Sequence, residues 1–227
     1  MKDFVNNPFS NLDLSRYRRE RESYQPFENN QLHELFGLKL LVGKGRMNMR
    51  EHLLFSILIS TGCRLDEAAL LTWVNIIQHA DGWFYVDLRN GIVKNSGSKR
   101  LLPIPDKLQE IMPSVGHQLI PDGLCASPDG SLFNYLDGDG KASRAALHAL
   151  ARQIDKIKPR ERQVAHSLQG NLKDILRDEG VSKELNDYIT GHAQGDVDSS
   201  YGSGHSIELR CEALNKPDHP YLTAYVF

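Results

Sequence analysis

Apolar residues along this chain recur mainly at helical spacing, about every three or four positions. Five stretches show the pattern and predict helices with one buried face. They are residues 28–41 (Leu32, Leu35, Phe36), 49–62 (Leu53, Leu54, Ile57, Leu58), 64–76, 143–154 (Leu147, Leu150, Ile154), and 168–192 as two short helices (Leu172, Ile175, Leu176; Leu185, Tyr188, Ile189). Capping signals mark their ends. The expected N-caps are Asn29 or Asn30, Ser143 and Ser182, and the expected glycine stops are Gly62, Gly180 and Gly191.

Between residues 83 and 104 the pattern changes to that of β-structure. "WFYVDL" and "RLLPIP" are β-like, and "VKNSGSKR" between them is rich in turn formers. The sequence therefore predicts a mainly α fold with a small antiparallel β-ribbon, an α+β class. Residues 121–142 are expected to form a loop. Asp137 and Asp139 in it weakly resemble a calcium loop, but a turn is favoured because the downstream ligands are missing.

Composition indicates an ordinary soluble globular protein. Of the 227 residues, 40% are hydrophobic and 25% charged. No apolar run is long enough to span a bilayer, and the N-terminus has no signal-peptide core. Three cysteines, an odd number without paired spacing, fit a reducing cytoplasm. The formal net charge of −2 gives no bulk argument for nucleic-acid binding, so such an argument must come from local clusters.

Residues 1–25 are expected to form an arm. Its arginines are interleaved with glutamates and are Arg16, Arg18, Arg19 and Arg21. The arm is interpreted either as a solvated linker or as a basic strap near DNA, since phosphate neutralisation needs only local cations.

Arg64, in "STGCRLDEAALLTW", lies at a predicted helix start. Free N–H groups at such a position, together with a guanidinium, suit a bound phosphate. The alternative is a structural arginine paired with Asp66 or Glu67.

Lys94 enters the turn of the predicted β-ribbon, and Lys99 and Arg100 follow closely. A hairpin tip with three cations can reach DNA, so Lys99 and Arg100 are predicted DNA-binding residues. The alternative is a solvated edge loop whose lysines discourage pairing with another strand.

Two histidines and a tyrosine complete the candidates. His166 precedes one predicted helix, His192 follows another, and Tyr201 lies among small, turn-forming residues that leave its hydroxyl exposed. Each alone fits capping, packing or an ordinary loop. No metal site is predicted, because neither HExxH nor CxxC spacing accompanies the histidines.

Taken in order, "TGCRLDE", "VKN", "HSLQ", "GHA" and "SSY" resemble the catalytic boxes of the tyrosine recombinases, the phage integrase family. The spacings of 26 positions (192 − 166) and nine positions (201 − 192) between the last three candidates are usual there. "YQPFENNQLHELF" is similar to the opening of the catalytic domain, and "NPF" to the interdomain linker. The resemblance covers roughly residues 24–210 and implies the tyrosine recombinase catalytic-domain fold. We expect a linker over 1–25, this domain over 26–210 and a C-terminal tail over 211–227.

The resemblance also implies site-specific DNA recombination, as in viral genome integration, through a 3′-phosphotyrosyl intermediate and without a cofactor or metal. Tyr201 would be the nucleophile, Lys94 the general acid, and Arg64 a clamp on the phosphoryl oxygens. His166 would take the nucleophile's proton or bind the phosphate. His192 would hydrogen-bond a non-bridging oxygen.

Gln169 departs from the family pattern H-x-x-R, because it stands where the second arginine belongs. Its amide can keep a neutral hydrogen bond to a phosphate oxygen, but it cannot form a charge-assisted pair. We therefore expect fold and DNA binding to survive and cleavage to be slowed by roughly 10²–10³. Arg162 or Arg177 could substitute in principle, although Arg177 lies ~12 Å further along the helix.

Three functions stay open at this point. The first is an impaired integrase, the second a DNA-binding, cleavage-deficient relative acting as a regulator, and the third a helical hydrolase or metal protein using His166 and His192. The expected partners are double-stranded attachment-site DNA and, in a full-length protein, further copies in a tetramer on DNA. No membrane partner is expected.

The two ends of the chain give further expectations. No counterpart of the family's N-terminal core-binding domain is evident before residue 25, so we expect an isolated or truncated catalytic domain that binds DNA weakly. The apolar tail "HPYLTAYVF" is expected to dock either on a neighbouring protomer or in cis.

Overall fold

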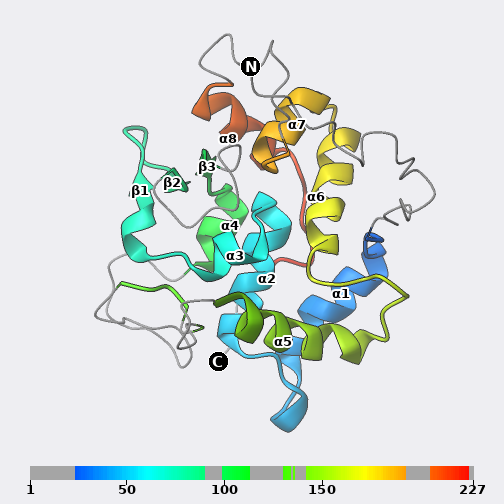
Figure 1. Cartoon of the computed structure of the whole chain (residues 1–227). Coiled ribbons are helices and arrows are strands. Elements are labelled where there is room, and N and C mark those ends of the chain that lie inside the picture. Colours follow the sequence, from blue (N-terminus) through cyan, green and yellow to red (C-terminus); the bar gives the residue numbers. More distant parts are fainter. Residues whose placement is uncertain are drawn as a thin grey trace, which may run out of the picture.

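The computed structural model describes residues 24–89, 99–112, 130–133, 135, 142–192 and 205–224 (Figure 1). The α-helices are α1 (Asn29–Gly37), α2 (Met49–Thr61), α3 (Leu65–Ala69), α4 (Asp106–Ile111), α5 (Ala142–Ile154), α6 (Ser167–Asp178), α7 (Lys183–Ile189) and α8 (Ile207–Asn215). The strands are β1 (Ile76–Gln78), β2 (Phe84–Asp87) and β3 (Leu101–Pro103), and 3-10 turns are η2 (Leu38–Leu40), η3 (Gly43–Gly45), η4 (Trp73–Asn75) and η6 (Asp155–Ile157). The predicted fold class, mainly α with a small antiparallel sheet, is confirmed.

Helix α2 runs through the centre of the molecule, with the sheet on one side and α6 on the other (Figure 1). It is apolar on nearly every face, as expected for a helix that is buried all round. Its three buried hydroxyls donate to backbone carbonyls four residues earlier, so their burial leaves no unsatisfied donor. They belong to Ser56, Ser60 and Thr61.

Gly62 ends α2 in the left-handed conformation, with φ of 67°, as the sequence predicts. A Cβ at this position would lie 2.9 Å from Thr190 Cγ2 and 3.0 Å from Leu172 Cδ2. The glycine therefore serves two purposes: it accepts the positive φ, and it lets the backbone after α2 approach α6 and the end of α7 closely. This close approach sets the position of Arg64, two residues further on.

The sheet has the order β1-β2-β3, and both pairings are antiparallel. The helix predicted from 64 to 76 is wrong beyond Ala69, because the 3-10 turn η4 occupies Trp73–Asn75 and strand β1 begins at Ile76. The reason is a partner distant in sequence: Trp73 N–H donates to the Gly130 carbonyl at 2.7 Å, and Thr72 forms an isolated bridge with Ser131. Local spacing carries no signal of such a partner.

Smaller differences between the prediction and the structure concern where helices begin and which of their faces are buried. Glu28, one residue before the predicted asparagines, is the N-cap of α1. Leu147 is 47% exposed rather than inward-facing, because Ala146 and Ala149 make the buried contacts of α5. Helices α4 and α8 were not predicted, and α8 spans the expected boundary between 210 and 211.

The tail packs in cis over its described residues. The Tyr221 ring stacks on Phe36 of α1 with 5.2 Å between centroids, and Leu222 is fully buried. Lys39 donates to the Thr223 hydroxyl at 2.7 Å and to the Thr223 carbonyl. Residues 216–224 therefore take the cis alternative.

Some residues singled out from the sequence cannot be compared with the structure. The arm up to residue 23, Asp137 and Asp139 lie outside the described residues. Cys63 and Cys211 are free thiols. Among the helices in the described ranges, none combines the length and apolarity needed to cross a bilayer.

Gly62→Ala is predicted to lower the free energy of unfolding by at least about 2 kcal/mol, because left-handed strain adds to the contacts with Thr190 and Leu172. Gly180→Ala is the matched control: its φ of 71° is similar, and a Cβ there meets nothing within 4 Å. Urea denaturation of both variants measures the difference. Equal losses would show that the close approach at Gly62 contributes nothing.

Stability is predicted to fall in acid because of His219, which is 1% exposed. Burial lowers its pKa from 6.5 to about 4. Between these two values the unfolded chain binds a proton that the folded chain does not. The free energy of unfolding therefore declines as pH falls from about 6.5 to 4, by about 3 kcal/mol from this group. His219→Gln should flatten that part of a urea-denaturation pH profile, and the exposed His148→Gln should not.

Candidate functional site

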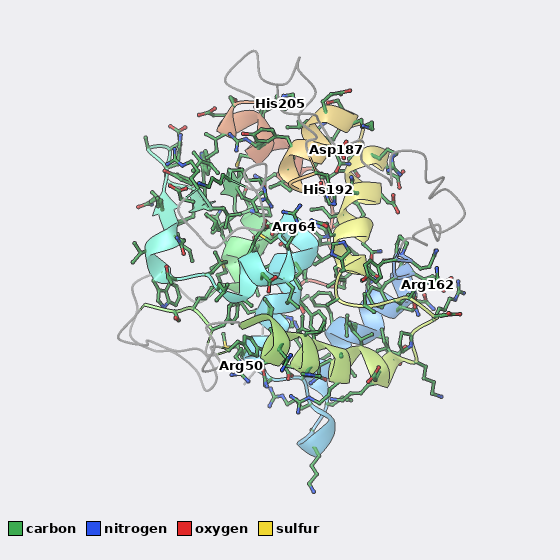
Figure 2. All side chains as sticks on the ribbon, in the orientation of Figure 1. Arg50, Arg64, Arg162, Asp187, His192 and His205 are labelled. Carbon is green, nitrogen blue, oxygen red and sulfur yellow. The ribbon has the colours of Figure 1, made fainter. Side chains whose placement is uncertain are left out.

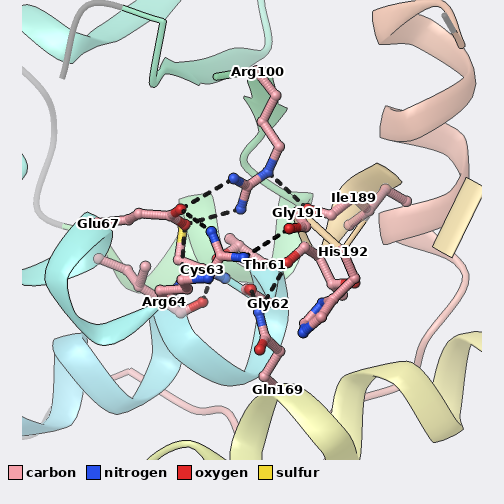
Figure 3. Close-up of polar contacts among 12 residues, drawn as sticks. Thr61, Gly62, Cys63, Arg64, Glu67, Arg100, Gln169, Ile189, Gly191 and His192 are labelled. Carbon is pink, nitrogen blue, oxygen red and sulfur yellow. Dashed lines mark hydrogen bonds and ion pairs between the residues drawn. The ribbon is translucent and has the colours of Figure 1, made fainter. Parts of the chain in front are cut away.

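Three consecutive carbonyl oxygens at the end of α7 each accept a hydrogen bond from a side chain of another element (Figure 3). The pairs are Ile189 with Arg100 Nε at 2.9 Å, Thr190 with Gln169 Nε2 at 3.0 Å and Gly191 with Arg64 Nη2 at 2.8 Å. The last carbonyls of a helix have no partner within it and carry partial negative charge, so they favour such donors. The end of α7 thereby positions two guanidinium groups and one amide.

Glu67 connects the two guanidinium groups (Figure 3). Its carboxylate, 2% exposed, accepts from Arg64 Nη1 at 3.2 Å and from Arg100 Nη2 at 3.0 Å. It also accepts from the Arg64 backbone N–H at 3.0 Å, at the start of α3. The pair with Glu67 that the sequence offered as an alternative for Arg64 is therefore present. With its side chain 20% exposed, Arg64 still borders solvent.

Arg100 differs from its prediction as a DNA-binding residue, and that prediction is corrected. It is 3% exposed, and its guanidinium faces inward to Glu67 and the Ile189 carbonyl. The reason is its place at the entry of β3, where the chain has turned back into the core. Lys99 beside it is exposed, so its predicted role stays open.

Gln169 is 3% exposed and joins the ends of two elements. Its Nε2 donates to the Gly62 carbonyl at 2.6 Å and to the Thr190 carbonyl at 3.0 Å. An amide nitrogen has two hydrogens, so both are used. A hydrogen bond from Gln169 to a phosphate, as predicted, would therefore require one of these two bonds to break. Its Oε1 is buried and has no hydrogen-bond partner among the described residues.

His192 lies directly after this junction. Burial, then electrostatic interaction with Lys173, Arg64 and His166, lowers its pKa below the usual value, and Asp187 opposes them. These side chains therefore surround one region, and Figure 2 shows Arg64, Asp187 and His192 together near the end of α7. At neutral pH the imidazole is uncharged.

The hydrogen-bond direction at His192 follows from Thr190. The Thr190 hydroxyl donates to the Asn186 carbonyl at 2.9 Å, so it accepts from His192 Nδ1 at 3.2 Å. A neutral imidazole has one N–H, and Nε2 is then an acceptor. Hydrogen bonding to an anion through Nε2 therefore requires that His192 first takes up a proton.

His166 lies at the N-cap of α6, and its exposed ring meets Tyr24 edge-on, 5.1 Å between centroids. The fold thus brings four predicted site residues to one region: Arg64, His166, Gln169 and His192. Predicted Lys94 and Tyr201 lie outside the described residues.

Two features of this region were not predicted from the sequence. They are the presence of Lys173 and the pairing of Glu67 with both arginines. The signal for Lys173 was its position four residues after Gln169, on the same helix face. Within the described ranges, no three His, Cys, Asp or Glu side chains are arranged to hold a metal ion.

Solved structures share this fold. The XerH site-specific recombinase, in its post-cleavage complex with palindromic difH substrate, aligns with a TM-score of 0.61 and 21% identity over 88% of this chain and 56% of that chain. The integrase from mycobacterium phage Brujita gives 0.58 and 15% identity over 92% and 63%. The Tn1549 transposon integrase with transposon right end DNA gives 0.56 and 17% over 93% and 71%.

No protein-family model and no curated protein matches the sequence. This chain spans little more than half the length of XerH, 56% in the post-cleavage complex. The structural neighbours are tyrosine recombinases, and the predicted tyrosine recombinase catalytic-domain fold is confirmed.

Glu67→Gln is predicted to lower the free energy of unfolding by about 3 kcal/mol, because it removes the negative charge that the buried Arg100 requires. Asp66→Asn, exposed in the same helical turn, is the matched control and should cost less than about 0.5 kcal/mol. Thermal and urea denaturation at pH 7 compare the two. Similar losses from both would contradict the role assigned to Glu67.

Proposed function

We propose that this chain is the catalytic domain of a site-specific DNA recombinase of the phage or prophage integrase type. The tyrosine recombinase catalytic-domain fold of this chain supports a recombinase as the class of protein. The observation that carries the proposal is the gathering of Arg64, His166 and His192 around position 169, beside the end of α7. The neighbours XerH and Tn1549 integrase are in complex with DNA substrates, which favours double-stranded DNA as the partner here. In a full-length protein we expect a tetramer on DNA, acting in the cytoplasm.

The reaction proposed is strand cleavage and rejoining. The Tyr201 oxygen attacks the phosphorus and forms a 3′-phosphotyrosyl ester, while the bond from phosphorus to the 5′-oxygen breaks. His166 takes the tyrosine proton, and Lys94 protonates the departing 5′-oxygen. A 5′-hydroxyl from a second strand then reverses these steps and releases the tyrosine. Bond energy is kept in the ester, so no cofactor is required.

Arg64 and His192 are proposed to bind the non-bridging oxygens. Arg64 is already held by Glu67 and the Gly191 carbonyl, so little reorganisation is needed when charge develops on the phosphate. His192 takes up a proton to donate through Nε2, and an adjacent phosphate anion favours that protonated form.

Gln169 is proposed to make this catalyst slow. An arginine has five N–H donors, so it could satisfy the Gly62 and Thr190 carbonyls and keep donors for a phosphate. Glutamine has two, and both carbonyls use them. The site therefore lacks a charge and also the hydrogen-bond donors that an arginine would bring. A loss of this kind costs roughly 10²–10³ in rate.

The same observation supports a second candidate, a DNA-binding, cleavage-deficient relative that acts as a regulator. It differs from the first in the fate of Tyr201, which would form no covalent link to DNA. DNA binding alone does not separate the two.

Gln169→Arg is predicted to raise the rate of covalent adduct formation by roughly 10²–10³ over the native chain, because it restores a charged clamp. The assay uses a pool of nicked duplexes of randomised sequence, in which loss of the short strand traps the cleaved state. Denaturing gels quantify protein-linked DNA, and sequencing of the trapped strands reports the site.

Tyr201→Phe in the Gln169→Arg background is the matched control and should abolish the adduct. An adduct that survives this change would remove Tyr201 as nucleophile. DNA binding without an adduct in Gln169→Arg would favour the regulator. Absence of both would overturn the proposed function.

A further inference from the structure

Lys173 lies on α6, four positions after Gln169, and therefore on the same face one helical turn away. Its Nζ contacts Asp187 of α7 at 2.6 Å, and its side chain is 26% exposed. The Lys173 carbonyl accepts from Asn186 Nδ2 at 2.8 Å, which ties this turn of α6 to α7. The ammonium is thus held between α6, which carries Gln169, and α7, which ends shortly before His192.

Asp187 holds a second lysine as well. Lys183 Nζ lies 3.0 Å from its other carboxylate oxygen, with a side chain 85% exposed. If Lys173 moves to another anion, Asp187 keeps a cationic partner in Lys183. The rearrangement therefore leaves the half-buried Asp187 carboxylate paired, and an unpaired carboxylate is the outcome that makes breaking an ion pair costly.

Lys173 also acts on the site directly. The Asp187 carbonyl accepts the His192 backbone N–H at 2.8 Å, so the ion pair borders that histidine. After burial, the charge of Lys173 is the strongest influence that lowers the pKa of His192, ahead of Arg64 and His166. The pair of Lys173 with Asp187, whose carbonyl accepts the His192 N–H, therefore lies beside the region where the anion is proposed to bind.

We propose that Lys173 contacts the phosphate bound beside Arg64 and His192, and so supplies the positive charge that Gln169 does not. This inference rests on the proposed function, since it names a further phosphate-binding residue of that site. A lysine is a flexible point charge, so it replaces the charge of an arginine and not its two-pronged geometry. Lys173 therefore restores phosphate binding more fully than it restores cleavage.

The two arginines that the sequence offered as substitutes are less well placed. Arg177 lies one turn beyond Lys173, pairs with Asp174 at 2.7 Å and is 67% exposed. Arg162 is exposed and lies before α6, in the turn that precedes His166. Its Nε lies 4.0 Å from Glu161 Oε1.

Binding of inorganic phosphate to the full chain tests the proposal without requiring cleavage. The imidazole signals of His192, followed by NMR at pH 7, report the dissociation constant. Lys173→Gln, which can still hydrogen-bond Asp187, should weaken phosphate binding about tenfold. Lys173→Arg should bind within about threefold of the native chain. Arg177→Gln removes a charge from the next turn and should change binding less than about twofold.

A double-mutant cycle with Gln169→Arg tests whether Lys173 acts in place of the arginine. In that background Lys173→Gln should weaken binding less than about threefold. An unchanged dissociation constant for Lys173→Gln in the native background would overturn the proposal, and so would equal losses in both backgrounds. Phosphate binding that depends on Lys173, in a chain that neither binds DNA nor forms a DNA adduct in any variant, would keep this inference and reject the proposed function.

Discussion

The free carbonyl oxygens at the end of α7 are the constraint on which the site depends. Helix geometry leaves them without partners, and this chain satisfies three in succession with Arg100, Gln169 and Arg64. Those donors come from the sheet, from α6 and from the turn after α2, so one short helix end fixes three elements against each other. Gly62 makes this possible, because any larger residue would separate α2 from the end of α7.

The same constraint explains why glutamine at position 169 is compatible with the fold. The Gly62 and Thr190 carbonyls require two donors, and a glutamine amide provides that number. The structural requirement is met in full, and nothing remains for a ligand. An arginine meets the same requirement with donors in excess. Glutamine therefore performs the structural role of this position in full, and the phosphate-binding role proposed for an arginine here would need donors that glutamine does not have.

The sequence predicts the parts of this structure that local patterns determine. The apolar spacing in α2, the Gly62 stop and the Ser182 cap of α7 are confirmed, because each depends on residues within a few positions. Predictions fail where the partner is distant: Trp73 bonds Gly130, and Arg100 turns inward to Glu67 although the exposed Lys99 precedes it. The ordered boxes indicated that Arg64, His166 and His192 would meet. The ordered boxes did not indicate which side-chain donors would hydrogen-bond to the carbonyl oxygens at the end of α7.

Charge at the site is unbalanced in a way that the net charge of −2 conceals. Each of its two described carboxylates serves two cations: Glu67 lies between Arg64 and Arg100, and Asp187 between Lys173 and Lys183. Positive charge therefore exceeds negative charge locally. Burial lowers the pKa of His192, and the charges of Lys173 and Arg64 lower it further. Repulsion among like charges is relieved when an anion enters, so the binding of a phosphate and the protonation of His192 favour each other. An excess of positive charge of this kind favours an anionic ligand, which is the physical argument behind the proposed phosphate site.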